Sequence, residues 1–211
     1  MINQPSDRAA WKLNAKLSTI SNQIGLAGIY LPFVAVLALA ADKPIAQLGR
    51  RLGLDNGFIS NFSILRTQYN FMVSKGFAAH LTTSDFWIFE AFIWIACITA
   101  VARILTGLCS PDVLSSHYQR LKREEREGKS TLKFLISLFL VGLVGVFLSL
   151  NFDWAYNSGQ ARFLMQCAPS ALICAQVLLF CGSVFFLTSG LMCLVSLVFA
   201  RKPRALGDVS F

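Results

Sequence analysis

The chain has 211 residues, of which 55% are hydrophobic and 14% are charged, whereas soluble domains carry about 25% charged residues. This composition excludes intrinsic disorder, a collagen-like chain and a small disulfide-stabilised domain. Because the hydrophobic residues gather in long uncharged runs, the sequence predicts an all-α integral membrane protein rather than a water-soluble domain.

Four hydrophobic runs approach the length of about 20 residues that a helix needs to cross the hydrocarbon core of a bilayer. The four predicted transmembrane helices are residues 24–41, 86–105, 134–152 and about 172–198. The last run is longer than a membrane requires, because no charged residue lies between Ala168 and Ala200. We therefore expect residues 1–211 to form a single multi-pass membrane domain.

The positive charges are divided unequally between the two sides of these spans, within a net charge of +8. Twelve Lys and Arg residues fall in the N-terminal segment, the second connection and the C-terminal segment, whereas six fall in the other two connections. Segments rich in Lys and Arg stay on the cytoplasmic side of a membrane. Both termini are therefore predicted to be cytoplasmic, in the inner (plasma) membrane of a cell. The charge then requires no nucleic acid as a partner.

The segment before the first span, residues 1–23, is predicted to form an amphipathic helix on the inner leaflet. Leu13, Leu17 and Ile20 recur there at helical spacing, with Lys12 and Lys16 between them. Basic amphipathic helices of this kind lie in the membrane interface.

The first connection, residues 42–85, is predicted to form an outer amphipathic cap of two helices. The first of them extends around residues 44–52. The second carries an apolar stripe of Phe58, Phe62, Leu65, Tyr69 and Met72. Gly76 suits the C-terminal end of this second helix. A structural cap and a small extracytoplasmic ligand or partner site are both open for this segment.

The second connection, residues 106–133, is predicted to carry a charged cytoplasmic helix that begins after Ser110 with Pro111. Its candidate partner-docking residues form an apolar stripe and a set of arginines: Leu114, Tyr118, Leu121, Arg120, Arg123 and Arg126. In a docking surface the stripe would supply affinity and the arginines would orient the partner. The alternative is that the inner leaflet or the helix bundle covers the stripe.

Small and polar residues repeat along the third and fourth spans, as they do where membrane helices approach closely. The candidate helix-packing residues are Gln176, Ser183 and Gly190 in the fourth span, and Gly142 and Gly145 in the third. We interpret both sets as packing surfaces, which do not by themselves indicate a pore.

Glu90 and Arg103 are the ionisable residues within the predicted spans, and such residues are functional candidates. They lie about 20 Å apart along one helix and cannot pair within it. We expect Ser84 and Asp85 to cap the outer end of that helix, so that each ionisable side chain reaches its own membrane interface. An intersubunit ion pair, an ion path and a ligand contact are the alternatives.

No familiar catalytic or cofactor-binding motif occurs in the chain. His80 and His117 both lie outside the predicted spans, so an intramembrane bis-histidine haem site is not expected. The sequence also lacks paired zinc-binding motifs, a nucleophile elbow and a phosphate-binding glycine loop. We therefore expect no catalytic residue, no metal and no cofactor.

The leading hypothesis is a non-enzymatic integral membrane subunit. It would oligomerise, or scaffold and anchor a larger inner-membrane assembly. Sensing at the membrane and docking of a cytosolic protein are further roles open to it. The alternative is a homo-oligomeric channel or pore, although no span carries a continuous polar stripe. A pore would expose Glu90 or Arg103 to water, whereas a scaffold would hold both at lipid interfaces or in contacts. An enzyme of unfamiliar type is the third hypothesis.

Overall fold

The structure is a computed structural model that describes residues 5–41, 59–77, 79–128, 130–151 and 169–199, with a few single residues between them. Helices are the regular secondary structure of these ranges, and short turns and bends join them. The helices are α1 (Pro5–Ala40), α3 (Ser63–Ser74), α4 (Ala79–Leu108), α5 (Pro111–Arg126), α6 (Thr131–Ser149) and α9 (Pro169–Phe199). The all-α class is confirmed.

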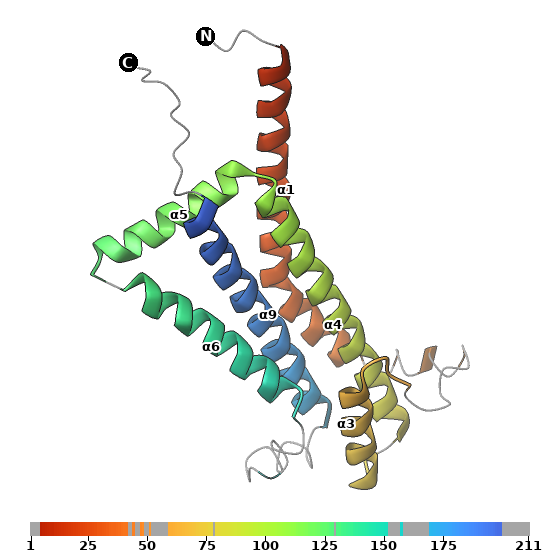
Figure 1. The fold of residues 1–211 in the computed structure, drawn as a ribbon. Helices are drawn as coiled ribbons and strands as arrows, with labels where there is room; N and C mark the ends of the chain where they lie inside the picture. Colours follow the sequence, from red (N-terminus) through yellow and green to blue (C-terminus); the bar gives the residue numbers. More distant parts are fainter. Residues whose placement is uncertain are drawn as a thin grey trace.

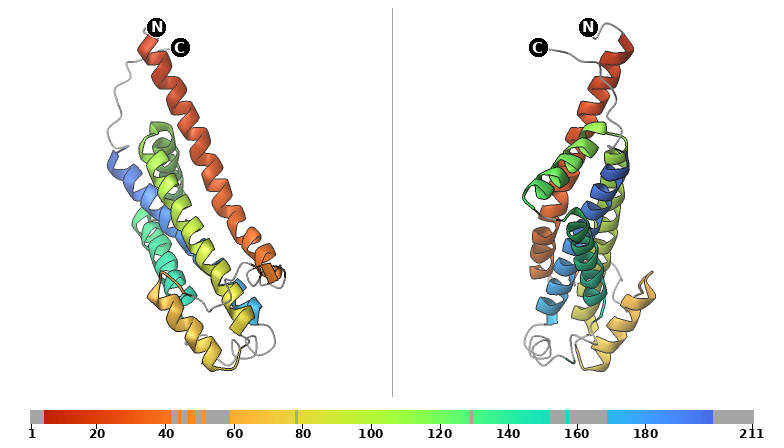
Figure 2. Two further views of the ribbon diagram at one scale, coloured as in Figure 1. Left: turned by 90° about the vertical axis from the view of Figure 1, so that its right-hand side faces the viewer. Right: turned by 60° about the vertical axis from the view of Figure 1, so that its left-hand side comes forward.

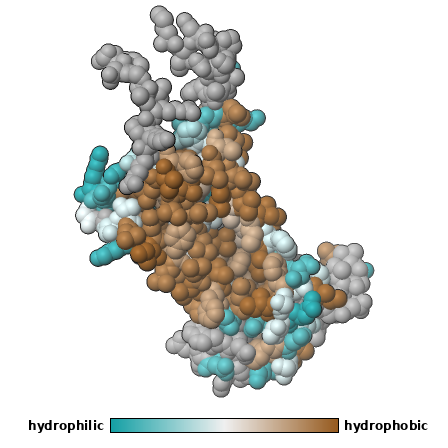
Figure 3. All heavy atoms as spheres, viewed as in Figure 1, coloured by the Kyte–Doolittle hydropathy of each residue, from teal (hydrophilic) through white to brown (hydrophobic). Residues whose placement is uncertain are grey.

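Three of the described helices are long and apolar enough to cross a membrane. These segments are Thr82–Leu108, Thr131–Ser149 and Ala171–Phe199, and they correspond to the second, third and fourth predicted spans. Figure 3 shows an apolar surface over the middle of the molecule, with hydrophilic residues gathered toward its two ends. The chain is therefore a multi-pass membrane protein.

The first predicted span lies in the second half of α1, which extends without interruption from residue 5 to residue 40. The boundary expected between a surface helix over 1–23 and a span over 24–41 is therefore absent. No glycine–proline pair or turn sequence stands at residues 22–25 to end a helix there. Pro32 lies inside α1 without ending it, as membrane helices tolerate. A fourth crossing stays a prediction.

Helix α4 begins at Ala79, seven residues before the predicted start of the second span. Ser84 and Asp85 consequently lie inside the helix rather than at its cap, and both are buried. The reason is tertiary: Leu65, Tyr69 and Met72 of α3 pack in one core with Phe86 and Phe89. Protein, rather than water or lipid headgroups, surrounds this polar part of α4.

Helix α3 is the second of the two predicted outer helices. It buries Leu65, Tyr69 and Met72, as the predicted stripe requires. Gly76 follows its end with a φ of 89°, a conformation that glycine adopts without strain. The other predicted outer helix, around residues 44–52, lies largely outside the described residues.

The helices assemble around α9. Helices α1, α4 and α9 pack against one another, whereas α6 packs mainly on α9 (Figure 1). Helix α5 crosses one end of this assembly beside the end of α9, and α1 projects beyond it, whereas α3 lies at the opposite end (Figures 1 and 2). The residues that join α4 to α6 are thus separated from the outer cap by the full length of the spans.

The predicted packing residues meet in the α6–α9 contact. A Cβ added at Gly142 would lie 3.1 Å from the carbonyl oxygen of Ser183, and one at Gly145 would overlap the Ser183 side chain. A Cβ at Gly190 would lie 3.4 Å from Leu138 and Phe139 of α6. Gln176 is also buried. The two predicted packing surfaces therefore join two helices of the same chain.

Candidate functional site

The carboxylate of Glu90 is buried within the chain, with 4% of the residue exposed. Its Oε1 accepts two hydrogen bonds from Asn61, one from the backbone N–H at 3.2 Å and one from Nδ2 at 3.1 Å. Other parts of the chain therefore cover this side chain, and the expectation that it reaches the membrane interface stays a prediction. The side chain connects the outer half of α4 to the segment before α3.

Local contacts fix the segment that carries Asn61. The Oγ of Ser60 accepts a hydrogen bond from the backbone N–H of Phe62 at 2.9 Å, and Arg66 donates to the Ser60 carbonyl at 2.8 Å. The ring of Phe62 packs on Trp94 of α4 with a centroid distance of 5.3 Å. These contacts hold the Asn61 donors over Glu90. No motif around Asn61 in the sequence indicates this contact.

More buried polar groups line the interface between α3 and the beginning of α4. The hydroxyls of Tyr69 and Thr83 lie 3.1 Å apart and form a hydrogen bond. Gln68, Thr82, Ser84 and Asp85 are buried in the same region of the chain. Hydrogen bonding of this kind stabilises a buried polar interface. These contacts favour the structural cap among the two roles open for this segment.

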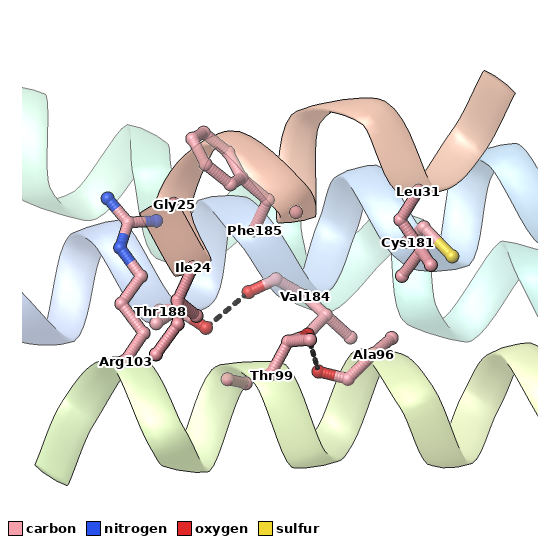
Figure 4. A pocket seen from close by; sticks show the side chains of 12 residues that line it. Ile24, Gly25, Leu31, Ala96, Thr99, Arg103, Cys181, Val184, Phe185 and Thr188 are labelled. Atoms are coloured by element: carbon pink, nitrogen blue, oxygen red, sulfur yellow. Dashed lines mark hydrogen bonds between the residues drawn. The ribbon is translucent and has the colours of Figure 1, made fainter. Parts of the chain in front are cut away.

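The guanidinium of Arg103 lies between three helices near the other end of α4. Its Cζ lies 4.8 Å from the ring centroid of Phe185, within the range of a cation–π interaction. Its Nη1 donates to the Oγ of Ser189 at 3.4 Å, a long hydrogen bond. Figure 4 shows the side chain reaching from α4 past Gly25 of α1 toward Phe185 of α9.

A groove of about 380 Å³ opens beside Arg103, where α1, α4, α5 and α9 meet. Its lining residues are Ser21, Asn22, Gly25, Leu26, Ile29, Arg103, Val113, Ser116, His117 and Phe185. Arg103 also borders a much smaller cavity of about 20 Å³ between α1, α4 and α9 (Figure 4), which has room for about one water molecule. The groove is the larger of these two spaces.

His117 of α5 contributes to this groove and is half-buried. Burial, together with the positive charges of Arg103 and Arg120, lowers its pKa from 6.5 to about 4. Its Nδ1 lies 3.8 Å from the Sγ of Cys193. The imidazole is therefore neutral at physiological pH, and arginine supplies the positive charge around the groove.

Helix α5 begins at Pro111, as predicted, after Ser110 in an extended conformation. The Ser110 side chain makes no capping hydrogen bond. Instead, its hydroxyl donates to Oδ1 of Asn14 at 2.8 Å, and Nδ2 of Asn14 donates to Asp112 at 2.6 Å. The predicted cap residue thus ties α5 to α1.

The apolar stripe predicted on α5 is turned largely inward. Leu121 is 1% exposed and packs with Leu135 of α6 and Cys193 of α9. Leu114 and Tyr118 are half-buried, whereas Arg120, Arg123 and Arg126 are exposed. The helix bundle therefore covers Leu121, which agrees with the alternative to docking for this residue. The arginines alone remain as a fully accessible set.

Glu90 and Arg103 belong to separate sites, because they lie about 20 Å apart on α4. Glu90 joins the outer cap to the bundle, and Arg103 lines a groove at the end where α5 lies. The sequence indicated both residues but neither set of neighbours. No protein family, curated protein or solved structure matches the chain.

Proposed function

We propose that the chain is a non-enzymatic integral membrane subunit that anchors or scaffolds an assembly in the inner (plasma) membrane. The contacts of Glu90 and Arg103 carry this proposal. A pore is expected to direct at least one intramembrane ionisable group into a water path. Here Glu90 accepts hydrogen bonds from Asn61, and Arg103 contacts Phe185 and Ser189, which is the behaviour expected of a scaffold.

Helix α5 would be the docking element for a cytosolic protein. Asn14 fixes its beginning to α1, and Leu121 fixes its middle to α6 and α9. A helix held at two points presents its exposed residues without a further cost of ordering. Since Leu121 is buried, the proposed docking surface is revised to the exposed arginines, with the half-buried Tyr118 beside them.

The proposed orientation places α5 and both termini in the cytoplasm. The unequal distribution of Lys and Arg supports it, with twelve on that side and six on the other. For a homo-oligomer or a larger membrane complex, α6 offers a second surface. Ile136, Leu140, Leu143 and Phe147 recur at helical spacing on α6 and are exposed. A helix of another subunit could pack there in place of lipid.

Affinity purification in a mild detergent tests the proposal, with the mass of the complex and its other chains as the readout. We expect a mass above that of the monomer, or a co-purifying cytosolic chain. Replacing Arg123 and Arg126 with Glu should remove that chain without lowering the melting temperature. Lys16→Glu, on the exposed side of α1, is the matched control.

Two results would contradict the proposal. One is a monomer without co-purifying chains under conditions that preserve the fold. The other is ion flux through liposomes that contain the purified protein, with a dependence on Glu90 or Arg103. The second result would support the channel hypothesis instead.

A further inference from the structure

The charge of Arg103 is not balanced by an acidic side chain in the part of the chain that the structure describes. The ion pair found there joins Lys122 and Glu125 on the exposed side of α5. Guanidinium has five N–H donors and stays protonated in proteins. One long hydrogen bond to Ser189 and the ring of Phe185 leave most of this donor capacity for another acceptor.

The position of Arg103 along the membrane normal suggests the source of that acceptor. It lies five residues before the end of the span at Leu108, about 8 Å along the helix. Gly25, against which its side chain lies, stands at the start of the uncharged run of α1, so the guanidinium lies near the end of the spans where the lipid headgroups are expected. Anionic oxygens at that depth are the phosphate oxygens of lipids.

The groove beside Arg103 changes from polar to apolar along α1. Ser21 and Asn22 line one part of it, and Leu26 and Ile29 line the next. Both Leu26 and Ile29 are about half exposed and belong to the uncharged run of α1. The distance from residue 21 to residue 29 is about 12 Å, comparable to a lipid phosphate, its glycerol and the first acyl carbons.

The backbone of α1 makes room for the guanidinium. Gly25 lies against it, since a Cβ added there would be 3.8 Å from the Nε of Arg103. A larger side chain at this position would extend into the groove beside Arg103. A substitution of Gly25 by a larger residue can therefore fill the groove while the positive charge of Arg103 is kept.

The electrostatic potential at the groove favours an anion. Arg103 and Arg120 are close enough that each affects the ionisation of His117, and no acidic residue is among those that line the groove. His117 itself is uncharged at neutral pH. Basic pockets between membrane helices on the cytoplasmic side commonly bind anionic lipid headgroups.

We infer that this groove binds an anionic phospholipid, with its phosphate on the guanidinium of Arg103 and its first acyl carbons along Leu26 and Ile29. Guanidinium is suited to this ligand because it can donate two parallel hydrogen bonds to one phosphate. The glycerol would lie beside Ser21 and Asn22. Its principal contact, Arg103, is not part of the docking surface proposed for α5, whereas Arg120 contributes positive charge to both.

The test compares lipids with identical acyl chains added to the delipidated full-length protein in a neutral detergent. Native mass spectrometry and thermal unfolding report binding of phosphatidylglycerol, phosphatidylcholine and inorganic phosphate. We expect phosphatidylglycerol to bind at least about tenfold more tightly than phosphatidylcholine, because the choline cation is repelled by Arg103 and Arg120 whereas both lipids offer the same phosphate. Inorganic phosphate at the same concentration should leave the melting temperature unchanged.

Three variants locate the site. Arg103→Gln should abolish the preference for phosphatidylglycerol, and Arg123→Gln, which removes the same charge from an exposed position of α5, should retain it. Gly25→Leu keeps Arg103 but fills the groove, and it should also abolish the preference. If Arg103→Gln does not fold, two single variants still test the site. They are Gly25→Leu and Arg103→Lys, of which the second keeps the charge but not the paired donors.

Several outcomes would overturn the inference. Equal binding of the two lipids would remove the role of the anionic headgroup. An equal loss in Arg103→Gln and Arg123→Gln would indicate general surface charge, and an unchanged preference in Gly25→Leu would place the lipid elsewhere. Stabilisation by inorganic phosphate equal to that by phosphatidylglycerol would indicate a free-anion site instead of a lipid site.

Discussion

A single oxygen atom, Oε1 of Glu90, receives both hydrogen bonds by which Asn61 attaches the outer cap to α4. Asn61 is exposed, so removing its acceptor costs about the net value of these two bonds, which need an oxygen at position 90 but not a negative charge. The identity of the acceptor at position 90 should therefore matter more to folding than its charge does.

Glu90→Gln and Glu90→Ala separate these two properties. Gln keeps an acceptor oxygen at this position, so we expect a change in unfolding free energy within about 1 kcal/mol. Ala removes both hydrogen bonds with Asn61 and should cost about 1–3 kcal/mol. Thermal unfolding in detergent measures both. A Gln variant as unstable as the Ala variant would show that the negative charge itself is required.

The neutral His117 predicts a dependence of stability on pH. Its pKa is about 4 in the folded protein and about 6.5 ordinarily, so the unfolded chain binds more protons between these values. Stability should therefore fall as the pH decreases from 7 toward 4, by about 1–2 kcal/mol for a half-buried ring. Between pH 7 and 8 this group should contribute no change.

The measurement compares melting temperatures of the wild type and His117→Gln across this pH range. The variant lacks the titrating ring, so the difference between the two proteins should shrink or reverse as the pH falls. Carboxylates that titrate below pH 5 affect both proteins alike and cancel in this difference. Parallel curves for the two proteins would contradict the assigned role of His117.

At the scale of helices, the α6–α9 contact offers a pair of matched glycine substitutions. A Cβ at Gly142 meets Leu187 and the Ser183 backbone, whereas a Cβ at Gly182 meets nothing within 4 Å. Gly142→Ala should destabilise the protein by about 1–3 kcal/mol through overpacking. Gly182→Ala should be neutral or slightly stabilising, because alanine favours helix.

Thermal unfolding and the mass of the detergent-solubilised protein report on this contact. Since Gly142 and Ser183 pack within one chain, we expect lower stability with an unchanged subunit number. Similar melting temperatures for Gly142→Ala and Gly182→Ala would mean that α6 packs differently. Dissociation of an oligomer without loss of the monomer fold would also contradict this arrangement.

The attachment of α5 to α1 is a second property at this scale. Asn14→Ala removes the hydrogen bonds to Ser110 and Asp112, which together contribute about 1–2 kcal/mol. We expect faster amide hydrogen exchange in the first turns of α5, with α9 unchanged. Gln23→Ala, at an exposed position of α1, is the control and should leave the exchange of α5 as it is.

Over the whole molecule, the beginning of α1, the end of α9 and α5 lie toward one end, opposite α3. Single cysteines at exposed positions should therefore divide into two groups. Lys16→Cys and Arg123→Cys should react from the cytoplasmic side, and Lys75→Cys should react from the outside. The background protein for this measurement has its own cysteines replaced. Labelling of Lys16→Cys and Arg123→Cys from opposite sides would contradict the fold.

Much of this arrangement could be predicted because it depends on local properties. The length of an uncharged run determines a span, and residues such as Gly76 and Pro111 mark the ends of helices wherever they occur. Ser84 and Asp85 misled the prediction because capping residues have the same appearance when another segment covers them. In the same way, the spacing of Ser183 and Gly190 indicated close packing but could not identify α6 as the partner.

For the site residues too, local properties could be predicted and tertiary contacts could not. Glu90 and Arg103 are conspicuous because charges are rare in membrane spans, and the sequence therefore indicated them directly. Asn61, Gly25 and Phe185, which surround them, come from segments distant in the chain. Such contacts depend on how the helices pack, and no periodicity in a single segment encodes them.

Because α1 is one continuous helix, a change in its tilt at one end moves its other end. Its 36 residues have a length of about 54 Å, of which the uncharged part from residue 24 onward takes up roughly half. A membrane helix adjusts its tilt to the thickness of the bilayer, and a rigid extension must follow that tilt. A change of about 10° would move the far end, about 28 Å away, by about 5 Å. If the uncharged part of α1 forms the predicted fourth span, a change in bilayer thickness would therefore displace the N-terminal end of α1.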